Sequence, residues 1–300
     1  SLLSFEEIPT SPAVYVQHFK SQETGKIYSR GVTGVYEWNS IENDDFRLCG
    51  VDVSNMTGAI EYMHVTSEFV VYVTRDIPTL TTRIYRADNV DVENPTLVHS
   101  YVGGYPTSMN CASYRDDNID VILVSTYNHV SDPSSSLPLF MSTDKGMTWQ
   151  KINETPVIDS TTNSHWHSVA YDPYGDMIWA GYGDGANRGI TWSYDMGQTW
   201  DRIQGVDQPT MILPFEDRVI FGRDASSKKP GLDRYERKGT AHEVELYDAL
   251  TFRTDQPANW NYPQHNFWAD TDIGYVLFSP TTAPLNDMQY IYATGDGGRT

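Results

Sequence analysis

Short runs of hydrophobic residues, separated by polar turns, recur along the whole chain. Five of these runs are rich in β-branched and aromatic residues and are too short to be core helices, which predicts buried β-strands. We therefore expect an all-β protein in which any helix is no longer than about two turns. The runs cover residues 69–76, 120–127, 176–184, 218–224 and 274–280.

Each hydrophobic run belongs to a larger unit. A further strand is predicted after every run, and a strand closed by a polar turn precedes most of them. The unit is strand, Asp-rich turn, strand, loop, strand, turn and strand, and it repeats about every fifty residues, with an incomplete first copy at 26–39. The following strands are at 82–88, 139–144, 189–195, 231–237 and 290–296, and the preceding ones at 111–118, 167–176, 210–217 and 266–272.

Four antiparallel strands per unit are typical of the blade of a β-propeller, in which radial closure protects the edges of the sheets. The repeat predicts five or six four-stranded antiparallel blades in a single domain spanning residues 1–300. The chain has no initial Met and ends within what reads as another copy of a repeated turn. We expect it to be a segment of a longer protein, with other domains of the same chain as partners.

Charge and hydropathy exclude two classes of partner. The formal net charge is −19 and the isoelectric point is about 4.6, which disfavours nucleic acid, because phosphate binding needs clustered Lys and Arg. The sequence has no apolar run long enough to insert into a membrane, and its first residues lack the features of a signal peptide.

Two of the predicted turns share a sequence motif. STDKGMTW at 142–149 is repeated as SYDMGQTW at 193–200, and TGDGGRT at 294–300 matches most of the pattern. In such a turn, Gly supplies a positive φ, the Asp carboxylate accepts backbone N–H groups and the Trp anchors the hairpin. We expect a structural role for Ser142, Asp144, Gly146, Trp149, Ser193, Asp195, Gly197, Trp200 and Asp296.

These turns resemble the Asp-box, or BNR repeat, of sialidase-like β-propellers. The resemblance implies that the turns lie at the outer edge of the blades, far from the axis where ligands bind. Proteins with this repeat include sialidases and other glycoside hydrolases, sorting receptors, and propellers on phage tail proteins that attach to bacterial surface glycans. The fold does not choose among these functions.

The sialidase pattern is not matched. That family usually has an Arg-Ile-Pro motif and three arginines for the substrate carboxylate, whereas the nearest string here is RDIP at 75–78. Arg75, Arg188 and Arg223 do not assemble convincingly into such a triad. The strongly negative net charge also repels an anionic sugar at long range, although a local basic patch can overrule it.

The richest group of polar residues lies between 163 and 189. His165 and His167 are two residues apart, so they share one face of a strand, and alignment of the units places His167, Cys111 and His265 at matching positions. Near the start of inner strands, such residues could converge on the propeller axis. The candidate ligand-binding residues are His165, Trp166, His167, Asp184, Arg188, Arg223, Asp224, His265 and Trp268.

Three interpretations of this group remain open. The two histidines could bind Zn or a similar metal with Asp184 or His265. Alternatively, Trp166 and Trp268 could present ring faces to a sugar. The histidines could also be satisfied by backbone carbonyls with no ligand. A glycosidase would need two carboxylates across a cleft, and Asp184 and Asp224 are the ones we nominate.

These patterns, and the resemblance of HxH…YDPYxDxIWxxYGD to phage tail and host-recognition propellers, favour one hypothesis. The chain is expected to be the non-catalytic, glycan-binding propeller of a phage tail receptor-binding protein, located on the virion or outside the cell. No cofactor is expected, and the resemblance suggests a homotrimer. The alternatives are an exo-acting, sialidase-like glycoside hydrolase using the axial cleft, and a structural platform for other domains.

Overall fold

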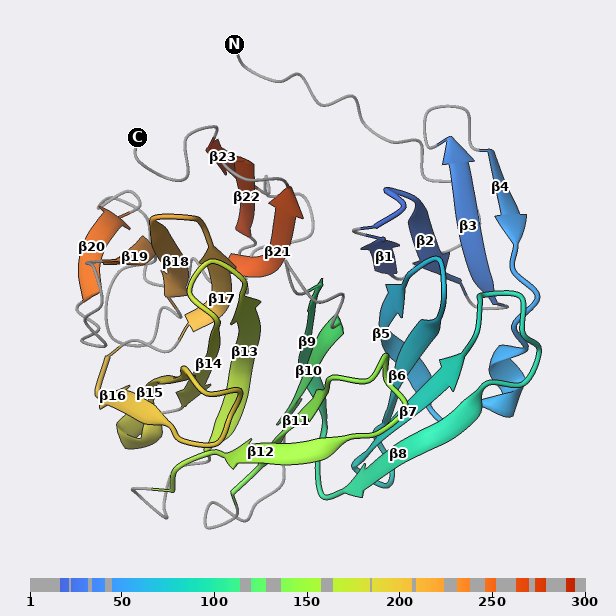
Figure 1. Cartoon of the computed structure of the whole chain (residues 1–300), viewed down its shortest axis with the longest axis horizontal. Helices are drawn as coiled ribbons and strands as arrows, with labels where there is room; N and C mark the ends of the chain where they lie inside the picture. The colour runs from blue at the N-terminus through green and yellow to red at the C-terminus, as the bar shows by residue number, and fades with distance from the viewer. Residues whose placement is uncertain are drawn as a thin grey trace. The chain divides into compact units, whose positions relative to one another are not determined.

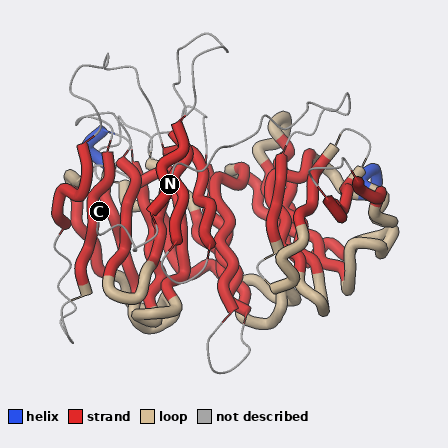
Figure 2. The backbone as a smooth tube through the Cα atoms, turned by 90° about the horizontal axis from the view of Figure 1, so that it is seen from above, coloured by secondary structure: helices blue, strands red, loops and turns tan. Residues whose placement is uncertain are grey.

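The computed structural model describes the chain from residue 17 to 294, except for residues 22, 32–33, 41–44, 114–119, 128–135, 158–163, 184, 207–208, 224–230, 238–245, 252–262, 270–272 and 279–289. Only the backbone is described at 17–20, 40, 108–113, 120, 185, 231, 246–251 and in the strands from 263 onward. Strands dominate the structure (Figure 2). Within the described residues, helix is limited to two short 3-10 segments, η1 (Val53–Asn55) and η2 (Gly185–Asn187).

The chain divides into two compact units. The first contains Ser1–Pro106 and Lys145–Trp149, and the second contains Thr107–Asp144 and Gln150–Thr300. Two four-stranded antiparallel sheets belong to the first unit, each with its strands in chain order. One sheet consists of β1 (Gln17–Lys20), β2 (Ile27–Arg30), β3 (Val35–Ser40) and β4 (Asp45–Leu48), and the other of β5 (Ala59–Val65), β6 (Val70–Asp76), β7 (Thr81–Ala87) and β8 (Thr96–Val102).

The remaining strands form four more antiparallel sheets, again with sequential neighbours paired (Figure 1). The first contains β9 (Tyr105–Ser113), β10 (Asp120–Tyr127), β11 (Pro138–Ser142) and β12 (Gln150–Glu154), and the second β13 (His165–Asp172), β14 (Met177–Gly183), β15 (Gly189–Ser193) and β16 (Asp201–Gln204). The third contains β17 (Pro209–Pro214), β18 (Arg218–Arg223), β19 (Gly231–Glu236) and β20 (Leu246–Thr251). The last has three described strands, β21 (Pro263–Ala269), β22 (Ile273–Phe278) and β23 (Tyr290–Thr294).

The prediction of an all-β chain built from repeated antiparallel sheets is confirmed. Two details differ. The copy at 26–39 is not incomplete, since β1 to β4 form a full sheet there. The first strands also begin and end earlier than expected. Strand β13 runs from His165 to Asp172, and the polar residues after Asp172 form the turn to β14. The number of blades remains a prediction.

Burial falls across the sheet of β13 to β16. Every residue of β14 is buried, whereas most of β16 is exposed. Strands β10 and β17 both lie against β13, and β21 lies against β17, so the inner strands of neighbouring sheets are adjacent (Figure 1). A strand covered on both faces needs apolar residues on both, which explains the unbroken hydrophobic runs in the sequence.

Face-to-face packing of sheets produces the cores. In the second unit, Val121 and Leu139 of one sheet pack with Val169 and Ile178 of the next. Full burial of side chains of this size contributes about 1.5–3 kcal/mol each. In the first unit, Tyr28 and Val35 pack in the same way with residues of β5 and β6. This packing fixes the ends of the first strands, where the candidate site lies.

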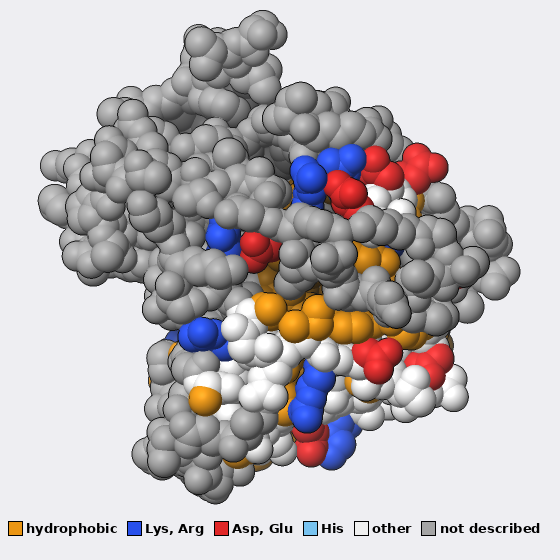
Figure 3. Space-filling view, turned by 90° about the vertical axis from the view of Figure 1, so that its left-hand side faces the viewer, with side chains coloured by type: hydrophobic (Ala, Val, Ile, Leu, Met, Phe, Trp, Pro, Cys, Tyr) orange, Lys and Arg blue, Asp and Glu red, His pale blue; other side chains and the backbone are white. Residues whose placement is uncertain are grey.

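On the face in Figure 3, acidic and basic side chains of the described residues are interspersed around a band of hydrophobic ones. In the part of the chain that the structure describes, no helix has the length and apolar character needed to cross a membrane.

Candidate functional site at the starts of the first strands

A β-bulge interrupts the first strand of four sheets close to its start. In β5, Ile60 pairs with Thr74 and Tyr62 with Val73, so that Glu61 is the extra residue. The same reading of the register identifies the extra residue of β13, β17 and β21. Bulges re-aim a side chain and are common beside functional sites. The bulged residues are all polar: Glu61, His167, Thr210 and Gln264.

The register corrects one alignment made from the sequence. His265 was expected to match His167, but His265 pairs with Leu277 in the way that Ser168 pairs with Gly181. The equivalent of His167 is therefore Gln264. Alignment on hydrophobic runs misses this shift because a bulge adds a residue to one strand without changing the periodic pattern of its partner.

His165 and His167 form an aromatic group with a residue of the neighbouring sheet. Their ring centroids are 4.6 Å apart with an angle of 32° between the planes. The ring of Tyr127, the last residue of β10, lies 4.0 Å from that of His165. His165 is buried and His167 is partly exposed. Tyr127 was not among the candidate residues, although it ends one of the hydrophobic runs that predicted the strands.

Close contact between sheets fixes the position of this group. The hydroxyl of Ser168 donates to the carbonyl oxygen of Pro209, the first residue of β17, at 2.7 Å. A Cβ on Gly181 would lie 2.4 Å from the side chain of Pro209, so only glycine allows β14 and β17 to approach this closely. The starts of β13 and β17 are therefore held together.

Trp166 does not present a ring to solvent, contrary to the expectation from the sequence. Its side chain is fully buried, packs edge to face with Tyr182 and donates its indole N–H to the carbonyl oxygen of Leu137 at 2.8 Å. The reason is strand alternation: a residue between two histidines on one face must point to the other face, which here is the core between two sheets.

The two arginines of the candidate set have different environments. Arg223 is buried and forms an ion pair with Asp233 of β19 at 3.8 Å, so its charge is engaged within its own sheet. Arg188 lies just after η2 and is partly exposed, and its Nε atom is buried without a hydrogen-bond acceptor among the described residues. Arg188 thus has donor capacity to offer a ligand.

Several candidates lie outside the described residues. These are Asp184, Asp224 and Asp296, together with the side chains of His265 and Trp268 in β21. Among the described residues, no three His, Cys, Asp or Glu side chains are grouped as metal ligands. A metal held by His165 and His167 with Asp184 or His265 therefore stays a prediction.

The second repeated turn uses its polar side chains internally. Asp195 accepts hydrogen bonds from the backbone N–H and the hydroxyl of Thr199 at 2.8 and 2.6 Å, and from the hydroxyl of Ser193 at 2.8 Å. These bonds, led by those from Thr199, lower the pKa of Asp195 to about 2. Gly197 has φ +86° and lies against Ile152 of β12. A carboxylate bonded in this way is suited to holding a turn, not to transferring protons.

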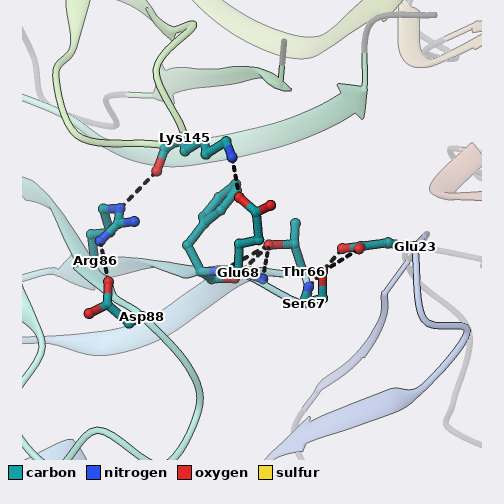
Figure 4. Close-up of polar contacts among 8 residues, drawn as sticks. Glu23, Thr66, Ser67, Glu68, Arg86, Asp88 and Lys145 are labelled. Atoms are coloured by element: carbon teal, nitrogen blue, oxygen red, sulfur yellow. Dashed lines mark hydrogen bonds and ion pairs between the residues drawn. The ribbon is translucent and has the colours of Figure 1, made fainter. Parts of the chain in front are cut away.

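The first repeated turn contacts the sheet of β5 to β8 (Figure 4). The carbonyl oxygen of Lys145 accepts from Nε of Arg86 at 2.9 Å, and the Lys145 ammonium pairs with Glu68. Beside Glu68, the backbone N–H of Ser67 donates to Glu23 at 2.7 Å, which joins the sheet of β1 to β4 to the same group. These residues lie at the end of β5 opposite its bulge, so the polar network is separate from the candidate site.

Comparisons with known proteins support the fold alone. No family model matches the chain, and no curated protein matches it. A GH74 xyloglucanase from Xanthomonas campestris is similar in structure, with a TM-score of 0.57 and 14% identity over 96% of this chain and 44% of that one. An ulvan lyase of polysaccharide lyase family PL25 has a TM-score of 0.54 and 10% identity over 93% of this chain and 80% of that one.

A third comparison shows how widely the fold is used. A structure from a study of two prolyl endopeptidases has a TM-score of 0.55 and 8% identity over 88% of this chain and 39% of that one. The chain spans less than half the length of the xyloglucanase. Together with the repeated four-stranded antiparallel sheets, these likenesses show a β-propeller fold. They do not choose an activity, because one fold serves many chemistries.

Proposed function

We propose that this chain is a glycan-binding β-propeller that engages its ligand at the starts of the first strands. The observation that carries the proposal is the repeated bulge, which gives three sheets of the second unit a polar residue at the same place: His167, Thr210 and Gln264. Residues with imidazole, hydroxyl and amide groups are the partners that sugar hydroxyls need. Tyr127 adds an aromatic ring beside the histidines.

The setting we propose is the attachment of a phage tail to a bacterial surface glycan. Support comes from the resemblance of the repeated turns to Asp-boxes and of the HxH segment to phage host-recognition propellers. A homotrimer on the virion, joined to other domains of the same chain, belongs to the same proposal. The xyloglucanase and the lyase are compatible with a carbohydrate ligand but share only the fold with this chain.

Binding without cleavage is favoured by the described side chains of the second unit. The carboxylate of Asp195 is bonded within its turn, that of Asp233 pairs with Arg223, and that of Asp172 pairs with Arg237. None of the three is therefore suited to act as the acid or nucleophile of a glycosidase. The second candidate function is a hydrolase that uses Asp184 and Asp224, the two carboxylates nominated from the sequence.

The test incubates the protein with purified bacterial surface polysaccharides and measures both retention and released reducing sugar. Retention without release, weakened about tenfold or more by His167→Ala, supports the proposal. Arg202→Ala is the matched control, because Arg202 lies on the exposed strand β16 of the same sheet. Sugar release that disappears in Asp184→Ala or Asp224→Ala would establish the hydrolase, and neither retention nor release would leave the structural platform.

A further inference from the structure

The bulge of β5 places Glu61 between two arginines of the first unit. Nη1 of Arg75 lies 3.6 Å from one oxygen of Glu61, and Nη1 of Arg30 lies 4.0 Å from the other. Both distances exceed that of a hydrogen bond, so the carboxylate balances charge without accepting a hydrogen bond from either arginine, and Nη1 of Arg30 donates instead to the carbonyl oxygen of Ile60. The three side chains are 16–30% exposed, which leaves them within reach of a ligand.

Arg75 is held as a rigid donor. Its guanidinium carbon lies 4.3 Å from the ring centroid of Tyr105, a cation–π contact, while 30% of the side chain remains exposed. Its Nε atom is buried and has no hydrogen-bond acceptor among the described residues. A planar donor fork of this kind fits the two oxygens of a carboxylate or a sulfate.

The charges close to this cluster favour an anion. Arg30 and Arg75 carry two positive charges against one on Glu61, giving a local surplus of one in a chain whose net charge is −19. The neighbouring Asp76 is paired with Arg83 at 2.9 Å. A local positive surplus can overrule the long-range repulsion of an anionic ligand, because nearby charges are screened less than distant ones.

We propose that Arg30, Arg75 and Tyr105 form an anion-recognition site for a carboxylate or sulfate group, with Glu61 as an internal competitor for the same guanidinium groups. The four residues belong to the first unit, so the site binds or fails independently of the histidines of β13. If the chain binds a glycan, the site selects acidic sugars, such as uronates or sulfated residues, over neutral ones.

Titration calorimetry at constant ionic strength tests the site with sodium sulfate, acetate, glucuronate and glucose as probes. Wild type is expected to bind the three anions and not glucose. Arg75→Gln and Arg30→Gln should each weaken anion binding about tenfold or more, since each removes charged donors. Arg75→Lys should lose most of the binding too, because it keeps the charge but not the fork. Tighter binding of glucuronate than of acetate assigns contacts to the sugar as well, and equal binding supports recognition of the anion alone.

Glu61→Gln distinguishes an anion-binding site from a group of ion pairs that has only a structural role. Removal of the competing carboxylate should raise the affinity for sulfate severalfold, on the order of tenfold. Glutamine is compatible with the backbone, since Gln264 occupies the equivalent bulge of β21. Arg86→Gln, at the opposite end of the same sheet, is the control and should bind as wild type does. Thermal melts show which variants are folded. No saturable binding by wild type, or unchanged or weaker binding by folded Glu61→Gln, overturns the proposal.

Discussion

The indole N–H of Trp200 donates to the carbonyl oxygen of Ile152 at 2.9 Å, across 48 residues of sequence. Ile152 belongs to β12, in the sheet that precedes the turn containing Trp200. The same N–H group also contacts the carbonyl oxygen of Gly197 within the turn at 3.1 Å. The second repeated turn therefore does more than close its own hairpin, because it also joins two neighbouring sheets.

Trp200→Phe is expected to lower the free energy of unfolding by about 1–2 kcal/mol, since both hydrogen bonds disappear while an aromatic ring remains. Trp149→Phe, which removes the bond to the carbonyl oxygen of Gly146, is the matched control and should cost about 1 kcal/mol. Urea unfolding measures both values, and polysaccharide retention should be unchanged in each. Equal losses of stability would show that the bond to Ile152 contributes nothing, and lost retention at unchanged stability would give the turn a role in binding.

Asp195 should make stability depend on pH in acid. Its folded-state pKa of about 2 lies below the ordinary value of 3.8, so the folded protein binds this proton less readily than the unfolded chain. The contribution is complete above about pH 4 and is lost as the pH falls towards 2. Thermal melts between pH 5 and pH 2 should show a shallower decline for Asp195→Asn than for wild type. Glu216→Gln, which removes an exposed charge in the same unit, should follow the wild-type curve.

His64 should produce a second acid transition at higher pH. Burial lowers its pKa to about 4, and its Nε2 atom has no acceptor among the described residues. Because the unfolded chain titrates near 6.5, stability is complete above that value and falls as the pH drops through 4, by an amount on the order of 3 kcal/mol. His64→Gln should remove this slope in urea unfolding between pH 7 and pH 4. A variant with the wild-type slope would show that the imidazole is already solvated.

The strands could be predicted from the sequence because inner strands covered on both faces must be continuously apolar. The bulges could not, since one extra residue in β13 or β21 leaves the hydrophobic period of the partner strand intact. For the same reason, the alignment of His265 with His167 was wrong by one residue. The burial of Trp166 was predictable, because strand alternation alone places it opposite its two histidine neighbours.

Contacts between sheets could not be predicted from the sequence. Nothing in the local pattern links Tyr127 to His165, or Arg30 to Glu61, because each pair meets only when two sheets pack. The pairing of Arg223 with Asp233 is a partial exception. Asp233 lies in the short strand β19, beside the buried strand β18. An acidic residue in such a position indicates that a buried cation lies nearby.

A buried ion pair connects the second and third sheets of the second unit. Asp172, at the end of β13, is fully buried and accepts hydrogen bonds from the guanidinium of Arg237 at 2.5 Å and the indole of Trp179 at 3.1 Å. Arg237 also donates to the carbonyl oxygen of Phe215 in the neighbouring sheet. Burial raises the pKa of Asp172, and the positive charge of Arg237 opposes that rise.

Removing the cation should cost more than removing the anion. Arg237→Met leaves a buried carboxylate without its counter-charge and is expected to lower the free energy of unfolding by about 3–5 kcal/mol at pH 7. Asp172→Asn keeps an oxygen for the indole of Trp179 and leaves Arg237 its carbonyl acceptor, so it should cost roughly half as much. Combining the two substitutions should recover part of the loss, since no buried charge remains unpaired.

The effect of pH on Arg237→Met provides an independent check. Without the arginine, the pKa of the buried Asp172 should rise further, so the folded variant takes up a proton that the unfolded chain does not hold at neutral pH. The free energy of unfolding of the variant relative to wild type should therefore improve as the pH falls from 7 towards 4, because a neutral carboxyl group is tolerated in the core. Urea unfolding of wild type, both single variants and the double variant at these two pH values measures the difference. A deficit that stays constant or grows in acid would mean that Asp172 is stabilised as a carboxylate by Trp179 and the backbone alone, and that Arg237 acts through its packing and its bond to Phe215.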